Sequence, residues 1–241
     1  MVSDRIGTLY GIGVGPGDPE LVTVKAANIL SRISCVFTAS SGANDHSIAL
    51  KIARSHLRHA DATHLPFPMT RDDAVVAQAV LENARRIVSV LKKGEDAAFL
   101  TLGDPLTYST FGRLVPALRG LLPEAKIATI PGITSYHAAA ASLDLPLVQE
   151  EESLTVLSGA TGAERLRDAV MVSDTVVVLK VYRHAARIFA TLEQLGLLDH
   201  AILVTRCGLE GERIVTDARS LKDGPIPYLS LLIVRASPQA F

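Results

Sequence analysis

Apolar and polar residues are distributed along this chain in a pattern that predicts an α/β protein. Short runs that are apolar throughout predict buried strands, because the strands of a parallel sheet are covered on both faces. In the first half of the chain such runs occur at Leu9–Val14, Ser34–Ala39, Ala97–Leu102 and Lys126–Ile130. In the segments between these runs, apolar residues recur every three or four positions, which predicts amphipathic helices. The clearest helix presents Val76, Val80, Ala84, Ile87, Val88 and Leu91 on one side.

Local signals refine these elements. Thr70 is the predicted N-cap of the long helix, because a threonine hydroxyl can accept a hydrogen bond from the first helical turn. Thr63–Met69 contains two prolines, which predicts an edge or extended segment and not a central strand. Pro116 predicts a kink or a restart in the helix it interrupts. Further helices are expected from Glu20 onward and at His46–Leu57, Tyr108–Leu122, Ser135–Leu143, Ala163–Val172 and His184–Leu195.

The second half of the chain is richer in strands and predicts a mixed sheet. Its strand-like runs are Leu154–Leu157, Thr175–Val181, Ala201–Cys207, Glu212–Thr216 and Tyr228–Val234. The acidic run Glu150–Glu152 is interpreted as a solvated loop. We therefore expect two α/β domains, residues 1–131 and residues 132–241, with a crevice between them for a small-molecule ligand.

Composition narrows the function classes. Of the 241 residues 48% are hydrophobic, 20% are charged, and the net charge is −1, which argues against a general binder of nucleic acid or of anionic membranes. The two cysteines, Cys35 and Cys207, are not in a metal-ligand spacing, so no metal is expected. No basic segment precedes a long apolar run, and no apolar stretch reaches the ~20 residues of a membrane span. A soluble, cytoplasmic protein is expected.

The turn Gly15-Pro16-Gly17-Asp18 follows the first strand and is the first candidate for chemistry. It does not match the dinucleotide fingerprint, because Pro16 stands where the third glycine should be and the second strand ends without an acidic residue. It is not a phosphate-binding P-loop either, since no Lys-Ser/Thr pair follows the glycines. A tight turn without a ligand and a loop facing a different ligand both stay open. The turns Gly103–Pro105 and Pro131–Ser135, and the turn after Lys180, are expected around the same crevice.

These turns carry a family resemblance. The chain resembles the tetrapyrrole methylases, S-adenosylmethionine-dependent enzymes that methylate uroporphyrinogen III and the precorrins. The resemblance lies in three stretches that occur in the same order and with similar spacing: Gly13–Ala26, Leu102–Ser109 and Pro131–Ser135. Phe67–Asp72, Thr101–Phe111 and Glu152–Gly159 resemble most the members that methylate C-20 of precorrin-2, or its cobalt form, in cobalamin biosynthesis. The resemblance implies a class III methyltransferase fold. Other members act at a different ring carbon or make diphthine, and a non-catalytic tetrapyrrole-binding module is the alternative outside enzymes.

The resemblance also implies a set of site residues. Asp104 is the expected catalytic residue, because its carboxylate can hold the amino group of the cofactor or collect a proton; bracing the turn is its alternative role. Residues expected to bind S-adenosylmethionine are Gly103, Asp104, Pro105, Thr107, Tyr108, Thr134, Ser135, Lys180, Val181, Tyr182, Cys207, Gly208, Ser230 and Leu231. Residues expected to bind the tetrapyrrole, which carries eight carboxylates, are Gly15, Pro16, Gly17, Asp18, Arg54 and Arg113. The family and the mean hydropathy of +0.29 also suggest a homodimer.

Overall fold

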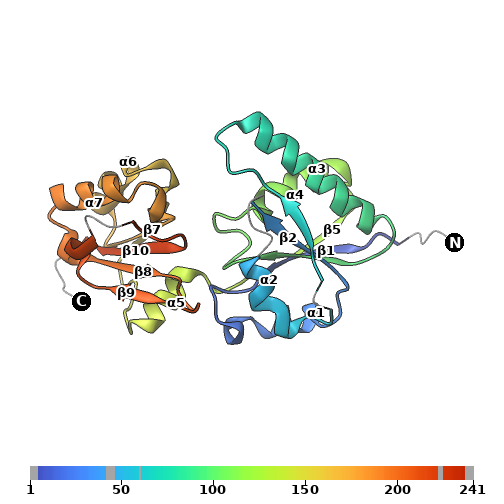
Figure 1. Ribbon diagram of the computed structural model, residues 1–241, viewed down its shortest axis with the longest axis horizontal. Helices are drawn as coiled ribbons and strands as arrows, with labels where there is room; N and C mark the ends of the chain where they lie inside the picture. Colours follow the sequence, from blue (N-terminus) through green and yellow to red (C-terminus); the bar gives the residue numbers. More distant parts are fainter. Residues whose placement is uncertain (1–4, 42–46, 60, 222–224, 237–241) are drawn as a thin grey trace. The chain divides into compact units, whose positions relative to one another are not determined.

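The computed structural model describes residues 5–41, 47–59, 61–221 and 225–236. The chain divides into two compact units, Met1–Thr134 and Ser135–Phe241. Each unit is built around one five-stranded sheet (Figure 1). The prediction of two α/β sheets is therefore confirmed.

The sheet of the first unit is parallel throughout, in the order β3-β2-β4-β1-β5. Its strands are β1 (Thr8–Gly13), β2 (Cys35–Ser40), β3 (Thr63–Pro66), β4 (Ala97–Thr101) and β5 (Lys126–Ile130). All five residues of β4 are buried, as the uniformly apolar run predicts. The proline-containing strand β3 lies at the edge, which confirms its predicted place.

Two pairs of helices cover the two faces of this sheet. Helices α1 (Val24–Leu30) and α2 (Ile48–Ala53) share one core cluster with Ile12 and Leu100. Helices α3 (Asp73–Leu91) and α4 (Phe111–Leu121) share the other with Leu9 and Phe99. The connections that follow β1 and β4 thus leave toward opposite faces, although β1 and β4 are neighbours. This is a topological switch point, where open α/β sheets bind their ligands.

The helices begin later than the sequence indicated. A one-turn 3-10 helix, η1 (Pro19–Leu21), comes first, and α1 begins only after Thr23, whose hydroxyl accepts from the backbone of Ala26. Helix α2 is followed by η2 (Arg54–His56), and His46, the expected start of this helix, lies outside the described residues.

The expected N-cap of α3 was wrong, and of the two alternatives at Pro116 the restart does not occur. The N-cap of α3 is Asp72, whose carboxylate accepts from the backbone N–H groups of Ala74 and Val75; the Thr70 hydroxyl accepts from Asp72 itself. Helix α4 starts at Phe111 and runs through Pro116 as one element, so there is no restart at the proline.

Three glycines let the loops after β1, β4 and β5 touch through their backbones. A Cβ on Gly132 would lie 2.2 Å from the carbonyl oxygen of Gly103 and 2.8 Å from Cα of Gly13. A Cβ on Gly13 would lie 2.6 Å from that same oxygen. Gly15 has a φ of +78°, and its carbonyl accepts from the backbone N–H of Gly103 at 2.7 Å. Side chains at these positions would separate the three loops.

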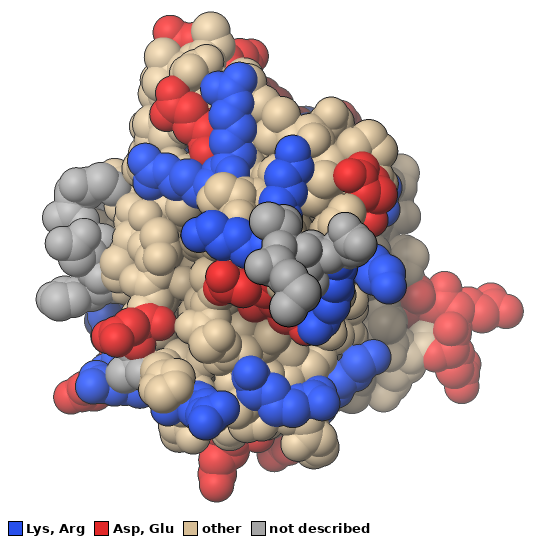
Figure 2. All heavy atoms as spheres, turned by 90° about the vertical axis from the view of Figure 1, so that its right-hand side faces the viewer, with Lys and Arg blue, Asp and Glu red and all other residues tan. Residues whose placement is uncertain are grey.

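The end of the first sheet at which its strands begin is rich in cations. In Figure 1 the N-terminus and the start of β1 point to the right, and Figure 2 shows that side, where Lys and Arg gather with Asp and Glu between them. Lys92 and Lys93 directly follow α3, and Arg119 lies in the last turn of α4. Cations at helix C-termini complement the helix dipole, so this charge distribution follows from the fold.

The second unit contains the expected mixed sheet, in the order β6-β7-β10-β8-β9. Only the β6–β7 pair is parallel. The strands are β6 (Leu154–Ser158), β7 (Thr175–Leu179), β8 (Ala201–Thr205), β9 (Arg213–Val215) and β10 (Ser230–Arg235). Helices α6 (Glu164–Val172) and α7 (Ala185–Gln194) pack on one face, and α5 (Ser135–Ser142) lies on the other (Figure 1).

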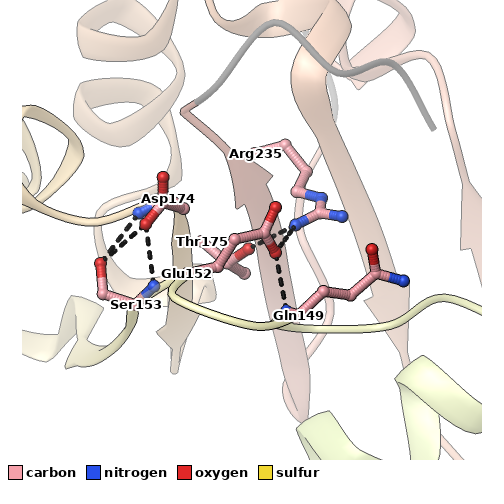
Figure 3. A network of polar contacts seen from close by, with 6 residues as sticks. All are labelled: Gln149, Glu152, Ser153, Asp174, Thr175 and Arg235. Carbon is pink, nitrogen blue, oxygen red and sulfur yellow. Dashed lines mark hydrogen bonds and ion pairs between the residues drawn. The ribbon is translucent and has the colours of Figure 1, made fainter.

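The acidic run before β6 is not simply solvated, as Figure 3 shows. The Glu152 carboxylate accepts from the guanidinium of Arg235 at 3.0 Å and from the backbone N–H of Gln149 at 2.9 Å, and the Arg235 side chain is only 11% exposed. Nearby, Asp174 accepts from the backbone N–H and hydroxyl of Ser153, and these hydrogen bonds lower the pKa of Asp174. The interpretation of Glu152 as solvated was therefore wrong; it attaches this loop to β10.

We predict that Gly132→Ala destabilises the protein by about 3 kcal/mol or more, because the new methyl group meets backbone atoms that cannot move independently. Gly120→Ala is the matched control. A Cβ at Gly120, inside α4, meets nothing within 4 Å. That variant should gain about 0.5–1 kcal/mol from higher helix propensity. Urea unfolding measures both, and equal midpoints would contradict the glycine contact.

We predict that Glu152→Ala lowers the free energy of unfolding by about 2 kcal/mol, because it leaves a buried guanidinium without its carboxylate. The control is Glu151→Ala, at the exposed neighbouring position. Its effect should stay within about 0.5 kcal/mol. Chemical denaturation measures the free energy of unfolding of both variants. Similar losses in the two would show that the ion pair does not contribute to stability.

Candidate functional site

The loop after β1 is the first part of the candidate site. Gly15, Pro16 and Gly17 are buried beside the switch point. Asp18 caps η1, because its Oδ1 accepts from the backbone N–H of Glu20 at 2.8 Å. The structure thus gives Asp18 a capping role at the start of η1, and ligand binding by this loop stays a prediction.

Asp104 lies at the end of β4 and connects separate loops. Its Oδ1 accepts from the backbone N–H of Leu106 at 2.9 Å and from the Thr107 hydroxyl at 3.2 Å. Its Oδ2 accepts from the backbone N–H of Gly132 at 3.2 Å. A carboxylate oxygen has room for about two hydrogen bonds, so Oδ2 keeps one acceptor position. Asp104 braces the turn and can still bind a donor.

The rest of this loop exposes apolar side chains. Pro105 is buried, and its carbonyl accepts from the Ser109 hydroxyl. Leu106 is 65% exposed, and Tyr108 is 46% exposed and has a φ of +48°. Left-handed backbone in a residue other than glycine concentrates at ligand-binding loops. Sequence reasoning omitted Leu106, although an apolar residue inside a polar turn was an available signal.

The two expected cations, Arg54 and Arg113, are not brought onto one face. Arg54 begins η2, which is joined to η1 by the ring of His56, 3.2 Å from the carbonyl of Pro19. Arg113 lies in the first turn of α4. Both are exposed, but their elements cover opposite faces of the first sheet.

The second unit brings its expected residues to one end of its sheet. Lys180, Val181 and Tyr182 follow β7, Cys207 and Gly208 follow β8, and Ser230 and Leu231 begin β10. Strand β10 is antiparallel to both neighbours, with Leu231 opposite Leu179 and Ser230 opposite Thr205. These residues therefore share one strand end. Thr134 and Ser135 lie at the junction of the units: Thr134 ends the first and Ser135 begins α5.

Backbone strain concentrates at this strand end. Lys180, Arg206 and Leu229 have φ values of +58°, +53° and +63°. The backbone N–H of Arg206 donates to the carbonyl of Leu229 at 2.9 Å, which links the segments after β8 and before β10. Such conformations cost roughly 1–3 kcal/mol each and persist where function requires them. Sequence reasoning missed Arg206 and Leu229, because neither residue type favours the left-handed region.

Cys207 and Ser230 have mainly structural surroundings. Burial and the Glu212 carboxylate raise the pKa of the Cys207 thiol to about 11, which disfavours the thiolate near pH 7. The Glu212 side chain also accepts from the backbone N–H of Gly208. The buried Ser230 hydroxyl donates to the carbonyl of Pro227 at 2.6 Å.

Within residues 5–41, 47–59, 61–221 and 225–236, no group of three or more His, Cys, Asp or Glu side chains is placed to hold a metal ion. Among the same residues, no helix has the length and apolar character needed to cross a membrane.

Comparison with known proteins identifies the family. The family model for tetrapyrrole (corrin/porphyrin) methylases matches residues 8–222. The cobalt-precorrin-2 C(20)-methyltransferase of Salmonella typhimurium is 34% identical over 230 residues, covering 95% of this chain and 96% of the relative. The precorrin-2 C(20)-methyltransferase of a Sinorhizobium species is 31% identical over 240 residues, covering 95% of each.

A solved structure shares the fold. The uroporphyrin-III C-methyl transferase from Thermus thermophilus, complexed with S-adenyl homocysteine, superimposes with a TM-score of 0.66 at 24% identity. The alignment covers 95% of this chain and 97% of that one. Together with the family match and the two relatives, these findings show that this chain belongs to the tetrapyrrole (corrin/porphyrin) methylase family.

Proposed function

We propose that this protein transfers a methyl group from S-adenosylmethionine to C-20 of precorrin-2, or of its cobalt form, in cobalamin biosynthesis. The observation that carries the proposal is full-length similarity: two relatives with this named activity match 95% of the chain at 31% and 34% identity. Methylation at another ring carbon and diphthine synthesis are not favoured by these relatives.

The residues present fit a ligand at the switch point. A Cβ on Gly103 would meet only the carbonyl oxygen of Ile133, at 3.9 Å, so the space beside this glycine is open. Its φ of +71° turns the backbone sharply after β4. A bound group can therefore approach backbone atoms there without competing side chains. The left-handed residues at the end of the second sheet offer a similarly fixed backbone.

When bound, the cofactor supplies an electrophilic methyl group on a sulfonium. The electron-rich meso carbon would form the new C–C bond while the C–S bond breaks and its electron pair stays on sulfur, and the proton that the carbon then loses would pass to water or to a carboxylate of the substrate. The protein's main task is to align the two reactants and exclude water, which can supply roughly 7–11 kcal/mol. The free acceptor position on Asp104 Oδ2 suits the cationic amino group of the cofactor.

The test is direct. Purified protein is incubated with methyl-labelled S-adenosylmethionine and precorrin-2 without oxygen, with and without cobalt. Label is expected in the tetrapyrrole, and NMR of the product should place it at C-20. Label at another carbon would assign a different member of the family, and no label in either form would overturn the proposal.

We predict that Asp104→Asn lowers kcat/KM about a hundredfold, or about 2.7 kcal/mol. The reason is that the amide NH2 group of asparagine would face groups that donate hydrogen bonds to the carboxylate in the wild type. Thr107→Val is the matched variant. It removes one of the hydrogen bonds to Asp104 and should lower kcat/KM no more than about tenfold. Calorimetry with S-adenosylhomocysteine should show weaker binding in Asp104→Asn. Wild-type binding and turnover in this variant would remove Asp104 from the site.

We also propose that the protein is a cytoplasmic homodimer. The mean hydropathy of +0.29 supports this, as do Met171 and Val172 at the end of α6, which are 76% and 77% exposed. Contiguous exposed apolar residues often mark contacts between subunits. Sedimentation equilibrium at micromolar concentration should give twice the chain mass, and cell fractionation should find the protein in the cytoplasm. A monomer mass would refute the dimer.

A further inference from the structure

Two tyrosines form an aromatic corner at the site end of the second sheet. Tyr182 lies in η4 (Val181–Arg183), directly after β7, and Tyr228 precedes β10. Because Leu231 pairs with Leu179, these segments lie side by side. The ring centroids are 5.1 Å apart and the rings are inclined by 76°. The edge-to-face arrangement holds both rings in a fixed orientation.

A guanidinium completes the corner. Nε of Arg183 donates to the Tyr182 hydroxyl at 2.9 Å, and Cζ lies 5.8 Å from the centroid of the Tyr182 ring. Among the described residues, the two terminal nitrogens of Arg183 make no hydrogen bond, so both can face a ligand.

The corner is open to a ligand. Tyr228 is 58% exposed and Arg183 is exposed. An exposed aromatic ring alone needs no explanation, but here the ring is held by a second aromatic ring and flanked by a cation. A planar conjugated ring can stack on tyrosine, and the paired terminal nitrogens of arginine match a carboxylate.

The charge of Arg183 favours a ligand that carries carboxylates, because a guanidinium attracts a carboxylate and repels a sulfonium or an amino group. Both reactants of the proposed reaction carry a planar ring and a carboxylate: the cofactor has adenine and one carboxylate, and the tetrapyrrole has pyrrole rings and eight carboxylates. The tetrapyrrole therefore offers more carboxylates to this corner, and separate binding measurements distinguish the two ligands. The Tyr182 hydroxyl accepts from Nε of Arg183 and so orients the guanidinium.

We propose that Arg183 and Tyr228 form a subsite for a carboxylate-bearing pyrrole ring of the substrate, with Tyr182 as the positioning residue. The subsite rests on the proposed function, since it takes the tetrapyrrole as the acceptor.

The test separates substrate binding from cofactor binding. Arg183→Met should raise KM for the tetrapyrrole about tenfold or more, because one charge-assisted contact is lost. Arg183→Lys should recover part of it, and Tyr228→Leu should raise KM several-fold, as expected for about 1 kcal/mol of stacking. The Kd for S-adenosylhomocysteine should not change in any variant. Arg187→Met, which changes an exposed arginine of α7, should behave like wild type.

Two other outcomes overturn the proposal. A weaker Kd for S-adenosylhomocysteine with an unchanged tetrapyrrole KM would assign the corner to the cofactor. No change in either constant would make the corner structural. If the wild-type protein methylates no tetrapyrrole, the proposed function fails separately. Uroporphyrin, a fluorescent probe with eight carboxylates, then tests the subsite by itself. Binding is measured by fluorescence quenching, and equal binding by wild type and Arg183→Met refutes the subsite. Thermal unfolding checks that the variants fold.

Discussion

The close approach of three backbones at Gly13, Gly103 and Gly132 is the constraint on which the first unit depends. The carbonyl of Gly103 lies where a side chain on either of the other two glycines would begin. Loops from β1, β4 and β5 can therefore act as one surface at the switch point. Asp104 then fixes the loop after β4 against the loop after β5, because its carboxylate accepts a hydrogen bond from the backbone N–H of Gly132. Without the glycine contacts this hydrogen bond could not form, and the open space beside Gly103 would lose its shape.

The second unit reaches a fixed backbone by another route. Lys180, Arg206 and Leu229 adopt left-handed conformations, although side chains oppose them, at roughly 1–3 kcal/mol each. The strain is offset by a continuous apolar core under α6 and α7 and by the ion pair of Glu152 with Arg235. Arg235 ends β10 and Ser230 begins it, so the ion pair and the strained turns lie at opposite ends of one strand. The ion pair therefore stabilises one end of the sheet, and the strained backbone lies at the other.

Sequence periodicity predicted the strands and the buried face of α3 well, because burial in these elements is decided by residues close in sequence. Sequence periodicity failed where the environment of a side chain is set by residues far away in the sequence or by the folded backbone. Glu152 reads as one of three solvated acids until Arg235, far along the chain, is placed beside it. Asp72 caps α3 in place of Thr70, because the two residues compete for the same turn and only the folded backbone decides between them. The motifs indicated Asp104, but not that its hydrogen bonds reach Gly132.

The geometry of Asp104 limits what one carboxylate can do. Two donors already occupy Oδ1 and one occupies Oδ2, so a single acceptor position remains. In the proposed reaction, an amino group held by Asp104 would fill this last acceptor position. The proton released by the ring carbon would then need another acceptor, such as water or a carboxylate of the substrate.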